Sequence, residues 1–261
     1  MVGTNPHGQA AEAAIAAASV PILELRGLEK RYGATHALKP ADLAFVRGEI
    51  HAIVGENGAG KSTLIKLLTG VITRTSGEVF WEGQPVALAT PHEAIEFGIN
   101  AVHQEVVLCR HLTVAANMFL GDEDVGFGLL RKGEMTRKAQ AILDDLGFQL
   151  PAHVLLGDLT IGQQQLIATA RASIRGTRFL IFDEPTAYLT RTEAAQLFAL
   201  IRRLKERGVT IVYISHRLEE VFELSDRVSI LRDGTLVGTR FTSDTNETEL
   251  TSPRINRPLA Q

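Results

Sequence analysis

Residues 55–63 of this chain read Gly55-Glu56-Asn57-Gly58-Ala59-Gly60-Lys61-Ser62-Thr63. They match the phosphate-loop pattern G-x-x-x-x-G-K followed by Ser or Thr. Mostly apolar residues at 50–54 predict a buried strand before the loop, and the apolar spacing of residues 61–68 predicts a helix after it. Such a loop points backbone N–H groups at a phosphate, and its glycines let the backbone approach without a Cβ clash. We therefore predict a nucleoside triphosphate site, with Lys61 on the β- and γ-phosphates and Ser62 as a Mg²⁺ ligand.

Length and composition restrict the class of protein. A chain of 261 residues is long enough for one large α/β domain or two small ones. The net charge of −3 gives no overall field that favours nucleic acid. The single cysteine, Cys109, cannot form an internal disulfide, which suits a reducing compartment. No long uncharged apolar run predicts a membrane span, and residues 1–20, which lack a basic start, are expected to be a flexible extension rather than a signal peptide.

Apolar patterning predicts a sheet domain with a helical insertion. Strands are expected at residues 22–25, 43–46, 77–81, 99–102, 179–182, 209–214 and 227–231. Capping boxes that begin at Thr90 and Thr190 predict helices directly after these residues. Apolar spacings of three and four between residues 106 and 176 predict a mostly helical subdomain inserted into the sheet domain. From residue 242 onward the chain is polar and is expected to be loosely ordered.

Polar residues near the predicted strands supply candidate chemistry. Asp183 ends an apolar strand, where a second Mg²⁺ ligand is needed, and Glu184 is placed to polarise a water that attacks the γ-phosphate. Gln104 also ends a strand and is a further candidate Mg²⁺ ligand, while His216 is a candidate hydrogen-bond partner of the γ-phosphate. Tyr32, ahead of the phosphate loop, is a candidate to stack on adenine. The alternatives are a solvated acidic turn, bystander strand-end residues and a half-buried strand tyrosine.

The order of these motifs resembles the nucleotide-binding domain of ABC transporters over about residues 20–240. The matching segments are the phosphate loop, Gln104 as the Q-loop, residues 159–163 (Leu-Thr-Ile-Gly-Gln) as the signature, residues 181–185 as Walker B, residues 187–190 as the D-loop and His216 as the switch. The resemblance implies an α/β P-loop NTPase fold with a RecA-like core, an antiparallel β subdomain and an inserted helical subdomain. It places the ATP-binding domain at 21–241, its helical part at about 106–176 and a loosely ordered tail at 242–261.

Members of this family act as head-to-tail dimers. The resemblance implies that Thr160, Gly162 and Gln163, at the start of a helix, contact the ATP that the partner domain holds. The alternative is an ordinary N-capped helix with a Gln-rich first turn. Two residues depart from the family pattern: Thr160 replaces the usual serine of the signature, and Tyr188 replaces a small residue of the D-loop.

Further segments are similar to ATPases of monosaccharide importers of the ribose, galactose and xylose type. These are the phosphate loop, the Gln-Gln-Gln end of the signature, residues 119–121 (Phe-Leu-Gly) and residues 215–220 (Ser-His-Arg-Leu-Glu-Glu). The resemblance implies an ATP-hydrolysing subunit, peripheral on the cytoplasmic face of a bacterial inner membrane. It would drive separate membrane permease subunits and, indirectly, use a periplasmic sugar-binding protein. Such ATPases usually carry two ATP-binding domains, so this one would pair with itself or with a second domain.

Two other functions stay open from the sequence. A soluble ABC-type ATPase that works on ribosomes or DNA is disfavoured, because no basic stretch interleaved with aromatic residues occurs and nucleic acid is not an expected partner. A regulatory domain that does not hydrolyse ATP is disfavoured by Glu184 and His216. Neither alternative would be coupled to transport.

Overall fold

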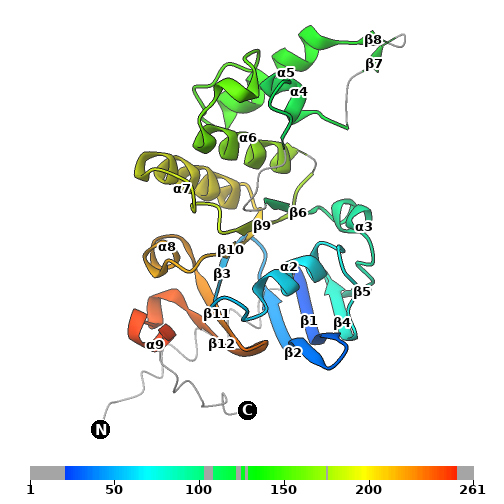
Figure 1. Ribbon diagram of the computed structural model, residues 1–261, viewed down its shortest axis with the longest axis vertical. Coiled ribbons are helices and arrows are strands. Elements are labelled where there is room, and N and C mark those ends of the chain that lie inside the picture. Colours follow the sequence, from blue (N-terminus) through cyan, green and yellow to red (C-terminus); the bar gives the residue numbers. More distant parts are fainter. Residues whose placement is uncertain (1–20, 103–107, 122–124, 127–128, 175, 252–261) are drawn as a thin grey trace.

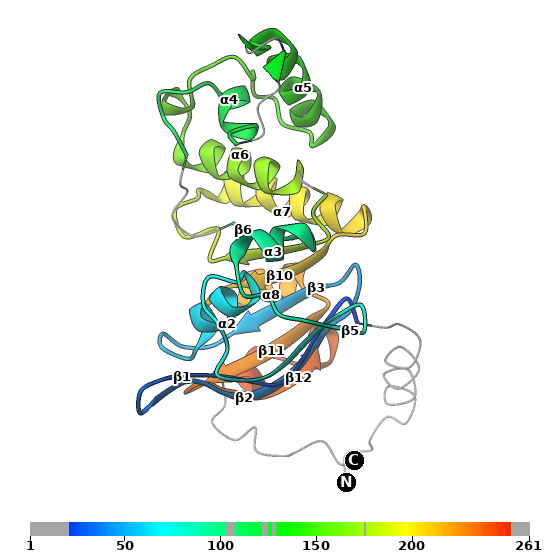
Figure 2. The same cartoon turned by 90° about the vertical axis from the view of Figure 1, so that its right-hand side faces the viewer.

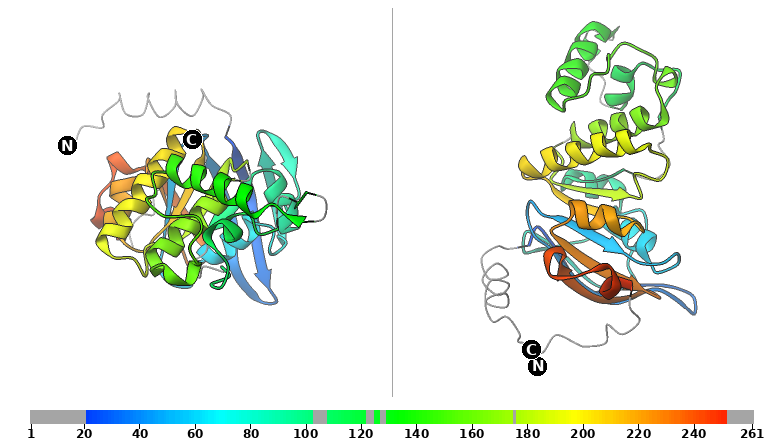
Figure 3. Two further views of the ribbon diagram at one scale, coloured as in Figure 1. Left: turned by 90° about the horizontal axis from the view of Figure 1, so that it is seen from above. Right: turned by 90° about the vertical axis from the view of Figure 1, so that its left-hand side faces the viewer.

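The computed structural model describes residues 21–102, 108–121, 125–126, 129–174 and 176–251. Two sheets occupy one end of an elongated molecule, and a block of helices occupies the other end (Figure 1). Helices α6 (Ile161–Ile174) and α7 (Arg191–Glu206) are stacked between the two ends (Figures 1 and 2, and the right view of Figure 3). The chain therefore folds as layers, with these two helices joining the helical block to the strands.

The larger sheet has six strands in the order β12-β11-β3-β10-β9-β6. In chain order they are β3 (Ile50–Val54), β6 (Ile99–Val102), β9 (Phe179–Asp183), β10 (Thr210–Ile214), β11 (Arg227–Arg232) and β12 (Thr235–Phe241). All pairs are parallel except β11 with β12. The strands β9 and β10 are almost wholly buried, as expected of parallel strands that are covered on both faces.

A smaller antiparallel sheet lies beside the phosphate-loop helix α2 (Lys61–Leu68) (Figure 1). Its order is β2-β1-β4-β5, from β1 (Leu23–Tyr32), β2 (Thr35–Phe45), β4 (Ser76–Trp81) and β5 (Gln84–Val86). The two sheets share an aromatic core, in which the ring centroid of Phe179 lies 5.2 Å from that of Phe45 and 6.3 Å from that of Trp81. Edge-to-face packing of this kind is a favourable arrangement for aromatic rings.

The helical block packs directly onto the apolar core of the sheet domain. Besides α6 it contains α4 (Val114–Met118), α5 (Lys132–Asp145), the 3-10 turn η1 (Leu156–Asp158) and a short hairpin of β7 (Val125–Gly126) and β8 (Leu129–Leu130). Its buried residues form one apolar cluster with residues of α7, β9 and β10, such as Leu143 with Leu197 and Tyr213. None of the described helices is both long and apolar enough to cross a bilayer.

Most strands and helices expected from the sequence are confirmed, and three expectations differ. The first two strands are longer than predicted, because the exposed polar half of β1 still pairs with β2 across register shifts. The chain after residue 242 forms the turn η2 (Thr242–Asp244) and helix α9 (Glu247–Thr251), where a loosely ordered tail was expected. Leu250 explains the difference, because it is buried against Val54 and Val228. The expected extension at 1–20 and residues 252–261 lie outside the described residues.

Helices α3 and α7 begin directly after the threonine residues that cap them. Helix α3 (Pro91–Glu96) begins after Thr90, whose hydroxyl accepts from the Glu93 amide; the Glu93 carboxylate accepts from Ala89 instead of closing the predicted capping box. Thr190 and Glu193 form the complete box at α7, as predicted. Helix α8 comprises Leu218–Leu224.

A polar group is buried at the centre of the larger sheet. His51 of β3 is fully buried, with Nδ1 2.9 Å from Oε1 of Glu49 and Nε2 2.7 Å from the Ser229 hydroxyl. Arg227 lies 3.6 Å from the other oxygen of Glu49. Burial lowers the pKa of His51 below its ordinary value of 6.5, although Glu49 acts in the opposite direction. Both ring nitrogens are therefore bonded, and the burial favours the neutral ring.

We expect His51 to make folding stability depend on pH. Since the pKa of His51 is lowered in the folded state, the contribution of His51 to the free energy of unfolding is present above pH 6.5 and is lost as the pH falls below that value. Urea unfolding between pH 5 and pH 8 should show a steeper loss for wild type than for His51→Gln, by up to about 1.4 kcal/mol per pH unit. Parallel pH profiles of the two proteins would contradict this assignment.

Candidate functional site

Three loops converge where parallel strands end. Strand β10 lies between β3 and β9, and its Ile214 is in register with both Ile53 and Asp183. The loops that follow therefore leave the sheet side by side, starting at Gly55, Ser215 and Glu184. Ligand sites of open α/β sheets lie at this carboxyl edge of the strands. The structure thus brings together the phosphate loop and the predicted carboxylates and histidine, as the sequence suggested.

The turn between β11 and β12 packs against the phosphate loop. The amide of Gly234 donates to the Ala59 carbonyl, at 3.0 Å. A Cβ atom on Gly55 would lie 2.2 Å from the Leu231 carbonyl oxygen, so this glycine is required by the neighbouring strand. Gly60, with φ of 105°, is the N-cap of α2. The sequence attributed the glycines to phosphate approach, but at Gly55 the close neighbour is protein backbone.

Lys61 is held inside the loop by backbone oxygens. Its side chain is largely buried, and Nζ donates to the carbonyls of Gly55, at 2.6 Å, and Glu56, at 3.1 Å. Of the other predicted loop residues, Ala59 is buried, Thr63 is half-buried, and Glu56, Asn57, Gly58 and Ser62 are exposed. The first turn of α2 contains no acidic side chain, so its positive end has no internal counter-charge there. The loop therefore presents an ammonium group and helix amides to an anion.

Glu184 and His216 meet at the same edge. An oxygen of Glu184 lies 3.2 Å from Nδ1 of His216, and the histidine is the more exposed of the two side chains. Glu184 has φ of 47°, and its amide donates to Ile214 of β10 at 2.9 Å. A non-glycine residue in this conformation is strained, and such strain is concentrated at functional sites. Asp183, the last residue of β9, is half-buried directly beside this pair.

Two further candidates lie at the margins of the site. Gln104 is outside the described residues, and β6 ends at Val102, which pairs with Phe182 at the same sheet edge. Tyr32 is half exposed at the turn between β1 and β2, with the Lys30 ammonium 5.1 Å from its ring centroid. Strand β2, which follows that turn, passes close to Gly60 at Ala37. The ring of Tyr32 is exposed, and its stacking on adenine stays a prediction.

The signature residues form a reciprocal cap at the start of α6. The Thr160 hydroxyl accepts from the Gln163 amide at 3.1 Å, and the Gln163 side chain accepts from the Thr160 amide at 3.0 Å. This is the N-capped helix that the sequence left open as an alternative. In Figure 1 helix α6 lies away from the phosphate-loop helix α2, with strands of the larger sheet between them.

Glu193 is a functional candidate that the sequence reasoning missed. It accepts the Thr160 hydroxyl at 2.8 Å while it closes the capping box of Thr190. Its carboxyl group also covers Gly162, where a Cβ atom would lie 2.1 Å from the carboxyl carbon. The capping box predicted only the local role of this glutamate. Its second role joins the signature to the D-loop, which only the packing of α6 on α7 reveals.

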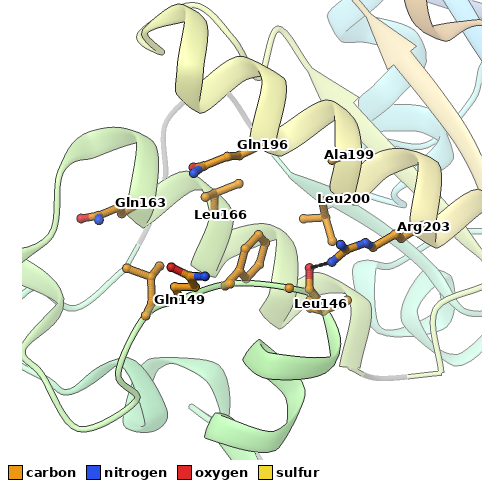
Figure 4. A pocket seen from close by; sticks show the side chains of 11 residues that line it. Leu146, Gln149, Gln163, Leu166, Gln196, Ala199, Leu200 and Arg203 are labelled. Atoms are coloured by element: carbon orange, nitrogen blue, oxygen red, sulfur yellow. Dashed lines mark hydrogen bonds between the residues drawn. The ribbon is translucent and has the colours of Figure 1, made fainter.

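A cavity of about 470 Å³ lies between residues 146–150 and helices α6 and α7, away from the phosphate loop (Figure 4). Arg203 of α7 lines one end of it and donates to the Leu146 carbonyl at 2.5 Å. Gly147 has φ of 79°, in the left-handed region that favours glycine. Gln163 lines the same cavity (Figure 4). The arrangement fastens the helical block to α7 and adds no group to the site at the sheet edge.

Comparison with known proteins identifies a family match and similar sequences. The model of the ABC transporter family matches residues 38–187. The chain is 49% identical over 241 residues to the ribose import ATP-binding protein RbsA of Yersinia pestis bv. Antiqua (strain Antiqua), a match that covers 92% of this chain and 48% of that protein. The chain thus spans about half the length of the curated relatives it matches.

Solved structures share the fold. The ADP conformation of MJ1267, an ATP-binding cassette of an ABC transporter, has a TM-score of 0.79 at 26% identity, over 90% of this chain and 96% of that one. A dimeric post-hydrolysis state of the ATP-binding cassette MJ0796 bound to ADP and Pi has a TM-score of 0.71 at 25% identity, over 84% and 98% of the two chains. The fold class expected from the sequence is confirmed.

Replacing Glu193 by alanine should cost about 1 kcal/mol of unfolding free energy at pH 7, because the hydrogen bonds that its carboxylate accepts from Thr190 and Thr160 are lost. The amide of Thr190 and then the hydroxyl of Thr160 hold the pKa of Glu193 below its ordinary value of 4.5. This stabilisation is therefore present above pH 4.5 and lost as the pH falls through the lowered pKa. Urea unfolding of wild type and Glu193→Ala should converge in acid, whereas Thr192→Ala serves as the exposed control. A difference that is the same at pH 7 and pH 3 would contradict this.

Proposed function

The chain belongs to the ABC transporter family, and we propose that it is the ATP-hydrolysing part of a bacterial importer of a monosaccharide such as ribose or galactose. The observation that carries the enzymatic part is the contact between Glu184 and His216 beside the phosphate loop. The import of a sugar is supported by the similarity to ribose import ATP-binding proteins.

The phosphate loop would bind the triphosphate. Backbone amides at the start of α2 and the Lys61 ammonium would face the β- and γ-phosphates. Residues 55–63 would together surround the phosphates, and Tyr32 would stack on the adenine. The supporting observations are the hydrogen bond from Gly234 to the Ala59 carbonyl and the two carbonyl contacts that orient the largely buried Lys61.

A Mg²⁺ ion fits the oxygen donors at this edge. The described residues contain no group of three or more His, Cys, Asp or Glu side chains that could hold a metal by themselves. Mg²⁺ commonly binds through one or two protein oxygens and substrate phosphates, which suits the Ser62 hydroxyl and the Asp183 carboxylate, with Gln104 as a further ligand. When bound, the ion would neutralise charge on the phosphates.

Hydrolysis would then proceed by in-line attack of water on the γ-phosphorus. Glu184 would orient the water by accepting its hydrogen bond and would take up its proton as the new P–O bond forms, while His216 would donate to a γ-phosphate oxygen. The bond from the γ-phosphorus to the β,γ-bridging oxygen would break, which leaves ADP and inorganic phosphate. The 3.2 Å contact between the two side chains supports their joint action, because it fixes the water-orienting carboxylate beside the phosphate-binding imidazole.

Thr160, Gly162 and Gln163 would contact ATP held by a partner domain, in a head-to-tail dimer with itself or with a second ATP-binding domain. The surface supports this role. Tyr188 of the D-loop and Ile161 of the signature are among the few large apolar side chains that are exposed in the described structure, at 64% and 63%. Exposed apolar groups beside predicted contact residues indicate a protein interface.

The partners of the importer would be membrane permease subunits and, through them, a periplasmic sugar-binding protein. The chain would be peripheral on the cytoplasmic face of the inner membrane. The dimeric cassette with ADP and Pi supports the pairing of such domains. The whole assembly would couple ATP binding and hydrolysis to sugar uptake.

Lys61→Ala should weaken binding of Mg-ATP by about 10- to 100-fold, because a charge-assisted hydrogen bond contributes roughly 1.5–3 kcal/mol. Calorimetric titration of the full chain measures this. Lys66→Ala is the matched control, since Lys66 is exposed on the same helix. Equal affinities of wild type and Lys61→Ala would overturn the assignment of the site.

Glu184→Gln should slow single-turnover hydrolysis by about 10²- to 10⁴-fold, because the amide orients water poorly and accepts no proton. ATP affinity should remain within about threefold, since the residue acts on the water rather than on the nucleotide. Glu206→Gln is an exposed control on α7. If wild type hydrolyses ATP no faster than Glu184→Gln while both bind it, the enzymatic proposal fails.

A further inference from the structure

One buried carboxylate binds side chains from both catalytic loops. Glu220 of α8 is 8% exposed. Its two oxygens accept the Thr186 hydroxyl at 2.7 and 2.9 Å, and one of them also accepts the Tyr213 hydroxyl at 2.8 Å and the Ser215 hydroxyl at 2.9 Å. A buried charge is tolerated when hydrogen bonds satisfy it in this way.

The three hydroxyl donors lie next to the residues that would carry out hydrolysis. Thr186 follows Glu184 by two residues, Tyr213 is near the end of β10, and Ser215 directly precedes His216. Glu220 therefore connects the loop after β9 with the loop after β10.

The connection is completed by Arg217. Its guanidinium lies 3.4 Å from Glu220, and its amide donates to the Ser215 hydroxyl at 3.0 Å. His216 is thus flanked on both sides by residues that the carboxylate holds, although its own ring is largely exposed. The exposed ring has little packing of its own, so its position follows from the backbone on either side.

The hydroxyl groups of Thr186, Tyr213 and Ser215 stay protonated, so they remain hydrogen-bond donors to Glu220. Burial, followed by the nearby charge of Glu220, raises the pKa of Tyr213, so its hydroxyl remains a donor. Thr186 and Ser215 are each 2% exposed. Loss of the acceptor would leave buried hydroxyls to find new partners, and the two loops would shift to provide them.

We propose that Glu220 is a positioning residue for ATP hydrolysis, which holds Glu184 and His216 at their working separation by tying their loops to one buried carboxylate. The proposal rests on the proposed ATPase function. It assigns Glu220 an effect on the rate of the chemical step and none on nucleotide binding, because no group that it contacts belongs to the phosphate loop.

The main test compares Glu220→Gln with Glu219→Gln in the full chain. Glu219 is exposed in the same turn of α8 and is the matched control. We expect Glu220→Gln to slow single-turnover hydrolysis by about tenfold or more, as small displacements of catalytic groups do. The Mg-ATP affinity should stay within about threefold, and Glu219→Gln should behave as wild type.

A double-mutant cycle with His216→Ala separates positioning from a general loss of structure. Because part of the effect of Glu220 runs through His216 and part through the loop of Glu184, adding Glu220→Gln to His216→Ala should slow the reaction by a clearly smaller factor than Glu220→Gln slows wild type. The second loop gives an independent check that does not require changing Glu220. Thr186→Ser keeps the hydroxyl and should hydrolyse ATP at the wild-type single-turnover rate. Thr186→Val lacks the hydroxyl and should hydrolyse ATP more slowly.

The results that would overturn the role of Glu220 differ from those that would overturn the ATPase function. A wild-type rate in Glu220→Gln, or rate losses that multiply in the cycle, overturns the positioning role and leaves the ATPase function intact. Equal rates for Thr186→Ser and Thr186→Val also overturn it, even if Glu220→Gln fails to fold. A wild-type chain that binds Mg-ATP without turnover overturns the proposed function and this inference with it.

Discussion

The parallel pairing of β3, β10 and β9 brings three loops to one edge of the sheet, and the functional site depends on that register. Ile53, Ile214 and Asp183 lie in one row across the sheet, so the chain segments after them are neighbours in space. In a parallel sheet every strand ends on the same side, which places a phosphate-binding loop, a carboxylate and a histidine together although they are far apart in sequence. A shift of one residue in either pairing would separate these groups.

Three glutamates tie neighbouring parts of the fold together. Glu49 contacts His51 inside the sheet, Glu193 joins the start of α6 to the start of α7, and Glu220 joins the two loops that carry Glu184 and His216. Glu193 and Glu220 accept hydrogen bonds from a second segment of the chain, and Glu49 reaches a second segment through its ion pair with Arg227. Polar groups that are satisfied in this way select one packing of the segments over others, because any alternative would leave them without partners.

The helical block and the sheet are mechanically joined. One apolar cluster runs from α5 through α6 and α7 to β10, and Arg203 fastens α7 to the Leu146 carbonyl. Helix α7, whose capping box includes Glu193, is thereby packed on the helical block. Since Glu193 also accepts the Thr160 hydroxyl, its carboxylate joins residues 159–163 to the start of α7.

The sequence by itself determined the phosphate loop, the order of the strands along the chain and the caps of α7, because these follow from local spacing and residue type. It also placed Asp183, Glu184 and His216 correctly at strand ends. It did not predict the helix at 247–251, since Leu250 is buried only by contact with distant strands. The tertiary structure alone decided that Gly55 makes room for the Leu231 carbonyl. It alone brought Glu184 within 3.2 Å of His216 and made Glu193 and Glu220 acceptors for distant residues, because pairing across segments far apart in the chain leaves no local pattern.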